Sequence, residues 1–126
     1  MPDARALPAA AACHNPQSVE AFLEALADVA PERAERPVLL AAVLADKDVD
    51  GIVALLAAAF PRVAVTQTAS PRALPATELA RAFAAAGVEV VGTYPTVSAA
   101  KSALCGESYV ACGSITLAGE LAGLFR

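Results

Sequence analysis

The only histidine of the chain, His14, stands directly before Asn15 and Pro16. Asparagine is a favoured N-cap and proline a favoured first helical residue, so this stretch predicts that a helix begins at Pro16. The free N–H groups at a helix N-terminus, together with the positive end of its dipole, attract a carboxylate or a phosphate. His14 therefore precedes a candidate anion site, although a histidine beside a helix cap is about as often a solvated residue without a ligand.

Further polar residues follow apolar runs elsewhere in the chain and could complete such a site. They are Asp46, Lys47, Ser70, Arg72 and Ser114. Lys47 offers a positive charge to a carboxylate, and Asp46 or Asp48 beside it is expected to cap the next helix. Each residue also has a plain interpretation as a capping side chain, a solvated lysine, a surface arginine or a serine in a turn. Together they fit an anion or amino-acid pocket.

Several catalytic patterns do not occur in the sequence. No glycine is followed by lysine, so there is no phosphate-binding P-loop motif, and there is no G-x-G-x-x-G motif. No histidine pair or histidine–carboxylate spacing indicates a metal site. A single histidine without a nucleophile elbow argues against a self-contained hydrolase.

Composition limits the class of protein further. The 126 residues are enough for one domain, and the net charge of −4 with no basic cluster argues against nucleic-acid binding. Three cysteines in an ungrouped arrangement fit neither a disulfide framework nor a zinc site, which favours a reducing cytoplasm. No apolar stretch approaches the roughly 20 residues of a transmembrane helix, and Pro8 interrupts the apolar run that a signal peptide would need.

The apolar pattern alternates between short continuous runs and stripes at helical spacing. The runs predict strands within residues 6–13, 37–45, 62–67, 88–92 and 108–113. The first is expected to be the least regular, because alanine is depleted in strands. Helical stripes lie between the runs, two of them ending at Gly87 and Gly106, and a last helix is expected after Ser114.

This alternation predicts an α/β domain with a doubly wound, mostly parallel sheet of five to six strands and helices on both faces. Ligands of such sheets bind outside the carboxyl ends of the strands. The loops that meet at that edge are predicted to be residues 13–16, 45–48, 67–75, 92–95 and 113–115. They contain all of the candidate residues.

Four segments carry a resemblance to a known family. They are CHNPQSVEAFLEAL, LLAAVLADKDVDGIVALL, VAVTQTASPRALPATELARAF and YVACGSITLAGEL. Together, in order and spacing, they resemble the C-terminal domain of folylpolyglutamate synthase/dihydrofolate synthase, in the Mur ligase superfamily. The similarity extends from Leu7 to Arg126. It implies a Rossmann-like fold in which residues 1–126 form one domain, with the N-terminal P-loop domain of the parent enzyme absent.

The resemblance also implies a function. These ligases use ATP to convert a substrate carboxylate into an acyl phosphate, which an amino group attacks to form an amide. This domain would present glutamate to a folate substrate, while ATP and magnesium would bind mainly to the P-loop domain of the same enzyme. The isolated chain would be an inactive, cofactor-free, cytoplasmic monomer that binds neither nucleic acid nor membrane.

The family's site residues transfer to matching positions of this chain. The glutamate would be bound by His14, Lys47 and Ser114, with Asn15, Asp46, Ser70 and Arg72 as further residues of the cleft. No catalytic residue or metal ligand is assigned.

One departure from the family pattern keeps a second function open. The family usually has Asp-Gly-Ala-His-Asn-Pro, and its aspartate is thought to face the nucleotide. Here Ala11 and Ala12 replace the aspartate and the glycine. The alternative is a stand-alone, non-catalytic binding or interaction domain on the same fold.

Overall fold

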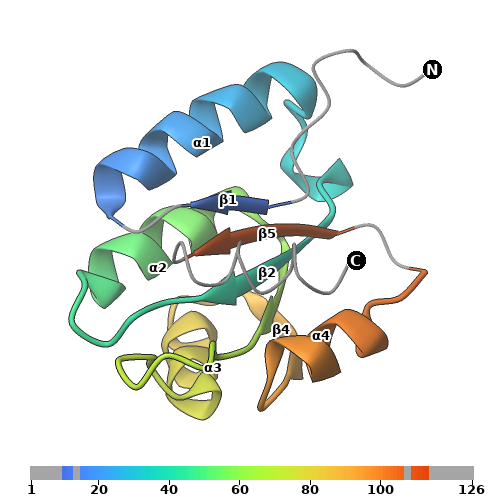
Figure 1. The fold of residues 1–126 in the computed structure, drawn as a ribbon. Helices are drawn as coiled ribbons and strands as arrows, with labels where there is room; N and C mark the ends of the chain where they lie inside the picture. Colours follow the sequence, from blue (N-terminus) through green and yellow to red (C-terminus); the bar gives the residue numbers. More distant parts are fainter. Residues whose placement is uncertain (1–9, 13–14, 107–108, 114–126) are drawn as a thin grey trace.

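Strands and helices alternate along the chain in the computed structural model, which describes residues 10–12, 15–106 and 109–113 (Figure 1). The elements are β1 (Ala10–Ala12), α1 (Pro16–Val29), a 3-10 helix η1 (Arg33–Glu35), β2 (Val38–Ala42), α2 (Val49–Ala59), β3 (Arg62–Val65), α3 (Ala76–Ala85), β4 (Glu89–Thr93), α4 (Val97–Ala103) and β5 (Tyr109–Gly113). The helix expected after Ser114 lies outside the described residues.

All strand pairs of the sheet are parallel, and the strand order is β1-β5-β2-β3-β4. The predicted parallel α/β class is therefore confirmed. Strands β5, β2, β3 and β4 form the body of the sheet, and β1 adds three residues at the edge. The described part of β1 lies within the predicted run 6–13.

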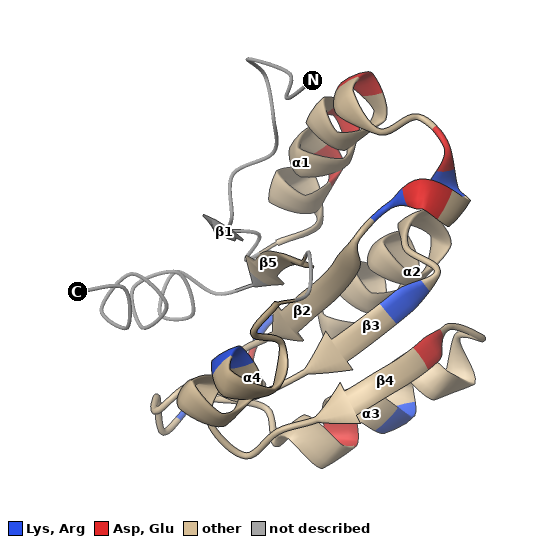
Figure 2. Cartoon of the chain, turned by 90° about the vertical axis from the view of Figure 1, so that its right-hand side faces the viewer, with Lys and Arg blue, Asp and Glu red and all other residues tan. Residues whose placement is uncertain are grey.

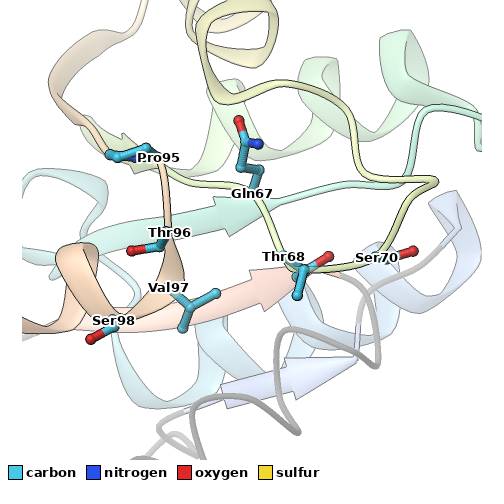
Figure 3. Close-up of a pocket in the computed structure, with 8 residues that line it drawn as sticks. Gln67, Thr68, Ser70, Pro95, Thr96, Val97 and Ser98 are labelled. Carbon is cyan, nitrogen blue, oxygen red and sulfur yellow. The ribbon is translucent and has the colours of Figure 1, made fainter.

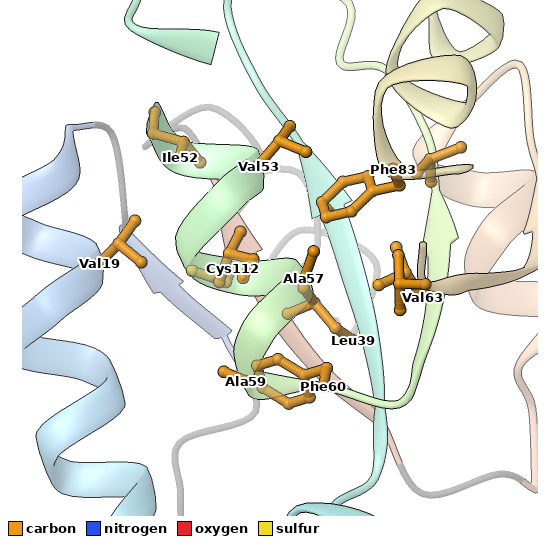
Figure 4. Packing of buried hydrophobic residues seen from close by; sticks show 14 of the residues in the cluster. Val19, Leu39, Ile52, Val53, Ala57, Ala59, Phe60, Val63, Phe83 and Cys112 are labelled. Carbon is orange, nitrogen blue, oxygen red and sulfur yellow. The ribbon is translucent and has the colours of Figure 1, made fainter. Parts of the chain in front are cut away.

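Helices cover both faces of the sheet, because side chains alternate along each strand. In β2, Leu39 and Ala41 pack with α1, α2 and α3, whereas Leu40 and Ala42 pack with α4. Figure 2 shows the helices on the two sides of the sheet, and Figure 4 shows Leu39 beside Ala57 and Phe60. Connections between parallel strands are right-handed, so the direction in which a connection crosses the sheet decides which face its helix covers. The connections from β2 to β3 and from β3 to β4 cross the sheet in one direction, and the connection from β4 back to β5 crosses it in the other.

The larger core cluster lies under the three helices α1, α2 and α3. Its members include Val19, Phe22, Leu26, Leu39, Ile52, Leu56, Phe60, Val63, Leu79 and Phe83. Phe22 of α1 stacks on Phe60 at the end of α2, with ring centroids 6.3 Å apart. The apolar stripes read from the sequence are therefore the buried faces of these helices.

The helix caps follow the sequence closely. The Asn15 side chain accepts a hydrogen bond from the Ser18 N–H at 2.8 Å, and Pro16 is the first residue of α1. Asp48 rather than Asp46 caps α2, since its Oδ1 accepts from the Gly51 N–H at 3.0 Å. Gly87, just past α3, has a φ of 88°, which suits glycine because it lacks a Cβ.

Two arginines hold the end of α2, a feature that the sequence analysis missed. Arg33 donates to the carbonyl oxygens of Ala57, Ala58 and Phe60 at 3.1, 3.0 and 2.7 Å. Arg36 donates to the carbonyl oxygen of Ala59 at 2.7 Å and to that of Ala30, after α1, at 2.8 Å. The last carbonyl groups of a helix have no partner within it, so these guanidinium groups satisfy them and oppose the negative end of the helix dipole.

The cysteines differ from the sequence-based expectation. Of the two in the described residues, Cys105 is an exposed free thiol, whereas Cys112 is buried in β5 and disulfide-bonded. The odd, ungrouped count gave no sign of this bond. None of the described helices is long and apolar enough to cross a membrane.

Candidate functional site

The ends of three strands lie in register at the carboxyl edge of the sheet. Ala12, the last residue of β1, pairs with Gly113 at the end of β5, and Gly113 pairs with Ala42 at the end of β2. The predicted glutamate ligands follow these strands. His14 and Ser114 lie outside the described residues, so the expected convergence of His14, Lys47 and Ser114 stays a prediction.

Lys47 lies in the tight turn between β2 and α2. Its N–H donates to the Leu44 carbonyl oxygen at 3.2 Å, and its own carbonyl oxygen accepts from the Val49 N–H at 2.8 Å. The residue is exposed, and within the described part of the chain its ammonium group forms no hydrogen bond or ion pair. The turn thus fixes the backbone of Lys47 and leaves its charge available to a ligand.

Asp46 and Arg72, two of the predicted cleft residues, bind each other. Arg72 donates from Nε at 3.0 Å and from Nη2 at 2.6 Å to one carboxylate oxygen, Oδ2 of Asp46. This hydrogen-bonded guanidinium holds the pKa of Asp46 below its ordinary value. Both side chains are more than half exposed, so the pair orients the loop more than it stabilises the fold.

Main-chain contacts join the same two loops. The Ala45 N–H donates to the Arg72 carbonyl oxygen at 2.8 Å, and the Leu74 N–H donates to that of Val43 at 2.9 Å. Between them, Leu44 and Ala73 form an isolated antiparallel bridge. The loop that carries Lys47 is therefore attached to the loop after β3.

The pH response of the Asp46–Arg72 pair is the first testable prediction. Because the pKa of Asp46 is lowered in the folded chain, the pair is fully formed above the ordinary aspartate pKa and is lost as pH falls through the lower, folded value. We expect Arg72→Ala to raise the Asp46 pKa toward 3.8. Carboxyl NMR titration measures the shift, and an Asp46 pKa that does not move would contradict the pairing.

A pocket of about 520 Å³ opens beside these loops (Figure 3). It is lined by residues 67–70, which follow β3, and 95–98, which precede and begin α4. Ser70, a predicted cleft residue, lies in its wall, and the Ser70 Oγ accepts from the Arg72 N–H at 3.1 Å. The sequence identified both loops as parts of the carboxyl edge, but nothing in it indicated that they enclose a pocket.

The known proteins and families that match this chain agree with the family resemblance seen in its sequence. The family described as Mur ligase, glutamate ligase domain, matches residues 10–114. Dihydrofolate synthase/folylpolyglutamate synthase of Mycobacterium tuberculosis is 46% identical over 71 residues, which are 56% of this chain and 14% of that protein. The chain therefore spans a small part of this relative.

Solved structures share the fold over most of this chain. The structure of M. tuberculosis folylpolyglutamate synthase complexed with ADP and AMPPCP matches with a TM-score of 0.72 and 30% identity, over 90% of this chain and 28% of that one. E. coli FolC in complex with DHPP and ADP matches with a TM-score of 0.74 and 20% identity, over 90% of this chain and 27% of that one. The E. coli likeness supports the fold alone.

The family match covers most of the chain, including every described strand and helix. The described sheet and the fold of the solved relatives agree with it. This chain belongs to the Mur ligase glutamate ligase domain family, as a C-terminal domain of the folylpolyglutamate synthase/dihydrofolate synthase type.

Proposed function

We propose that this chain binds glutamate and presents its amino group in an ATP-dependent ligase that adds glutamate to folate. The supporting observation is the register of Ala12, Gly113 and Ala42 at one edge of the sheet. His14 and Ser114 follow β1 and β5 within two residues, and Lys47 follows β2 after a short turn. A lysine, an imidazole and a hydroxyl from these three loops suit a dicarboxylate.

Amide formation uses only the amino group of glutamate, so a domain that holds both carboxylates leaves the reacting atom free. The amine nitrogen forms a bond to the acyl carbon of the activated carboxylate, the bond from that carbon to the phosphate oxygen breaks, and the nitrogen loses a proton as phosphate leaves. The contribution of this chain is orientation, because fixing the amine near the acyl carbon removes much of the entropic barrier.

We assign ATP and magnesium to a P-loop domain of the same enzyme, since the sequence of this chain contains no P-loop motif. The described residues also contain no group of three or more histidine, cysteine, aspartate or glutamate side chains placed to hold a metal ion. Folate would contact this domain only when the two domains close around both substrates. We also propose that this ligase is monomeric and cytoplasmic.

A second candidate is a non-catalytic binding domain on the same fold. It is favoured by Ala11 and Ala12, which lie in β1 where the family has aspartate and glycine. A full-length protein that carries this domain and binds glutamate, but forms no amide from ATP and a folate acceptor, would support this candidate over the ligase.

Glutamate titration of the 126-residue chain tests the glutamate site directly. With uniformly 15N-labelled protein, we expect L-glutamate to shift the amide NMR signals of residues 45–48 and of the first turn of α1. The affinity should be in the millimolar range, because one wall of a two-domain site cannot desolvate the ligand.

L-Glutamine is the matched control, because it has one carboxylate in place of two and nearly the same shape. We expect it to bind several-fold more weakly, since a charge-assisted hydrogen bond is about twice as strong as a neutral one. Equal shifts with both compounds, or signals of residues 45–48 that do not move with glutamate, would contradict the proposed site.

A further inference from the structure

The pocket between β3 and β4 has a topological cause. Helix α3 packs on the face of the sheet that α1 and α2 cover, whereas α4 packs on the other face. The loops that leave these two neighbouring strands therefore turn in opposite directions and leave a crevice between them. In parallel α/β sheets, ligands bind in such a crevice at the carboxyl ends of the strands. Among the described connections, β3 and β4 are the adjacent strands that meet this condition.

The size and chemistry of the lining indicate what the crevice can bind. Its volume of about 520 Å³ is that of a site for a small organic molecule. The polar side chains in its wall are Gln67, Thr68, Ser70, Thr96 and Ser98, and none of the residues that line it is charged. An ion entering it would lose hydration without meeting a side chain of opposite charge, which is costly, whereas an uncharged ligand would not.

Two hydroxyl groups in the wall of the crevice already accept hydrogen bonds from the chain, so they can still donate hydrogen bonds to a ligand. The Ser70 hydroxyl oxygen accepts from the Arg72 N–H, and the Thr96 hydroxyl oxygen accepts from the Ala99 N–H at 3.0 Å. Each hydroxyl hydrogen can then be donated to an acceptor in the pocket. Pro95 and Val97 add an apolar surface on the α4 side (Figure 3). A flat apolar ring that bears a carbonyl oxygen matches both features.

Thr68 supplies an independent observation in the same wall. The residue is only 6% exposed, and its hydroxyl oxygen is buried without a hydrogen-bond partner among the described residues. A buried hydroxyl left unpaired destabilises a protein, and a bound carbonyl group would remove that penalty. Rotation by one rotamer step about the Cα–Cβ bond can bring the hydroxyl to the place that the methyl group now occupies, so the Thr68 hydroxyl can turn to meet a ligand.

From these observations we infer that the β3–β4 crevice is a second small-molecule site, which binds an uncharged planar carboxamide or lactam. Its lining includes none of the proposed glutamate ligands His14, Lys47 and Ser114, and Ser70 is the one residue that it shares with the wider cleft predicted from the sequence. The two sites can therefore be tested separately.

Nicotinamide and nicotinate are suitable probes, because they share a ring and a shape and differ in charge at neutral pH. In an NMR titration of the 15N-labelled 126-residue chain, we expect nicotinamide to shift the signals of residues 67–70 and 96–98. Nicotinate should bind about tenfold more weakly, which corresponds to about 1.4 kcal/mol. Glutamate, added alone, should leave these signals in place while it shifts those of residues 45–48.

Two variants locate the nicotinamide site. Ser98→Leu fills part of the pocket and should abolish the shifts, while Ala103→Leu, at an exposed position of the same helix outside the lining, should not. Thr68→Val removes the unpaired hydroxyl at nearly constant volume and should weaken nicotinamide binding about fivefold without unfolding the chain. Equal binding of the two probes, nicotinamide shifts outside the pocket, or no shifts at all would overturn the inference, whatever the result with glutamate.

Discussion

Lys47→Ala is expected to raise the KM for glutamate about 10- to 100-fold in a full-length folate–glutamate ligase that carries this domain, with little change in kcat. Hydrogen bonds to charged groups contribute about 1.5–3 kcal/mol, and removal of the ammonium group leaves one glutamate carboxylate without its partner. If Lys47 binds glutamate equally tightly in the ground state and in the transition state, its removal raises KM and leaves kcat unchanged. Steady-state kinetics at saturating ATP and folate acceptor measures both constants.

Two further variants make this result specific. Arg81→Ala removes a positive charge from an exposed position of α3, away from the loop that holds Lys47, and should leave the KM for glutamate unchanged. Lys47→Arg keeps the charge and should restore part of the affinity. If Lys47→Ala behaves like Arg81→Ala, Lys47 is a solvated residue beside the Asp48 cap, and the proposed glutamate site is wrong.

The sequence predicted the elements well wherever a local pattern determines them. Ile52, Val53 and Leu56, which are apolar residues at helical spacing, lie on the buried face of α2, and the apolar run within 37–45 contains β2. The apolar run places the end of β2 too late, because the run continues to residue 45 whereas the strand ends at Ala42. Val43 is buried but has left the strand, and its carbonyl oxygen accepts from Leu74 of the next loop. Periodicity reports burial, so it does not separate a strand from a buried loop that continues it.

Contacts between residues far apart in the sequence could not be predicted, because no local sequence pattern indicates them. Arg72 and Asp46 were each recognised as polar residues of the carboxyl edge, yet their pairing with each other depends on the attachment of two loops. Arg33 follows α1 in the sequence and was assigned no role, although its partners lie at the end of α2. The pocket likewise depends on the divergence of two helices, which follows from strand order and not from its lining residues.

Substitution of Arg33 is expected to have the second large effect, a loss of stability. Its guanidinium group donates to three carbonyl oxygens at the end of α2, with distances of 2.7 to 3.1 Å. Arg33→Ala would leave these groups to water or unpaired, and would remove a positive charge from the negative end of the helix dipole. We expect the free energy of unfolding to fall by about 2 kcal/mol, less than the sum of three bonds to a charged group, because the arginine is itself exposed.

Urea denaturation of the 126-residue chain, followed by circular dichroism, measures this loss. Arg62→Ala is the matched control, because Arg62 is exposed at the start of β3, close in sequence to the end of α2. Arg33→Lys keeps the charge but has one ammonium group in place of the planar fork that reaches three oxygens, so it should recover only part of the stability. If Arg33→Lys were as stable as the original chain, the charge alone would account for the effect. If Arg33→Ala cost no more than Arg62→Ala, the end of α2 would not depend on this arginine, and its carbonyl groups would be satisfied by solvent.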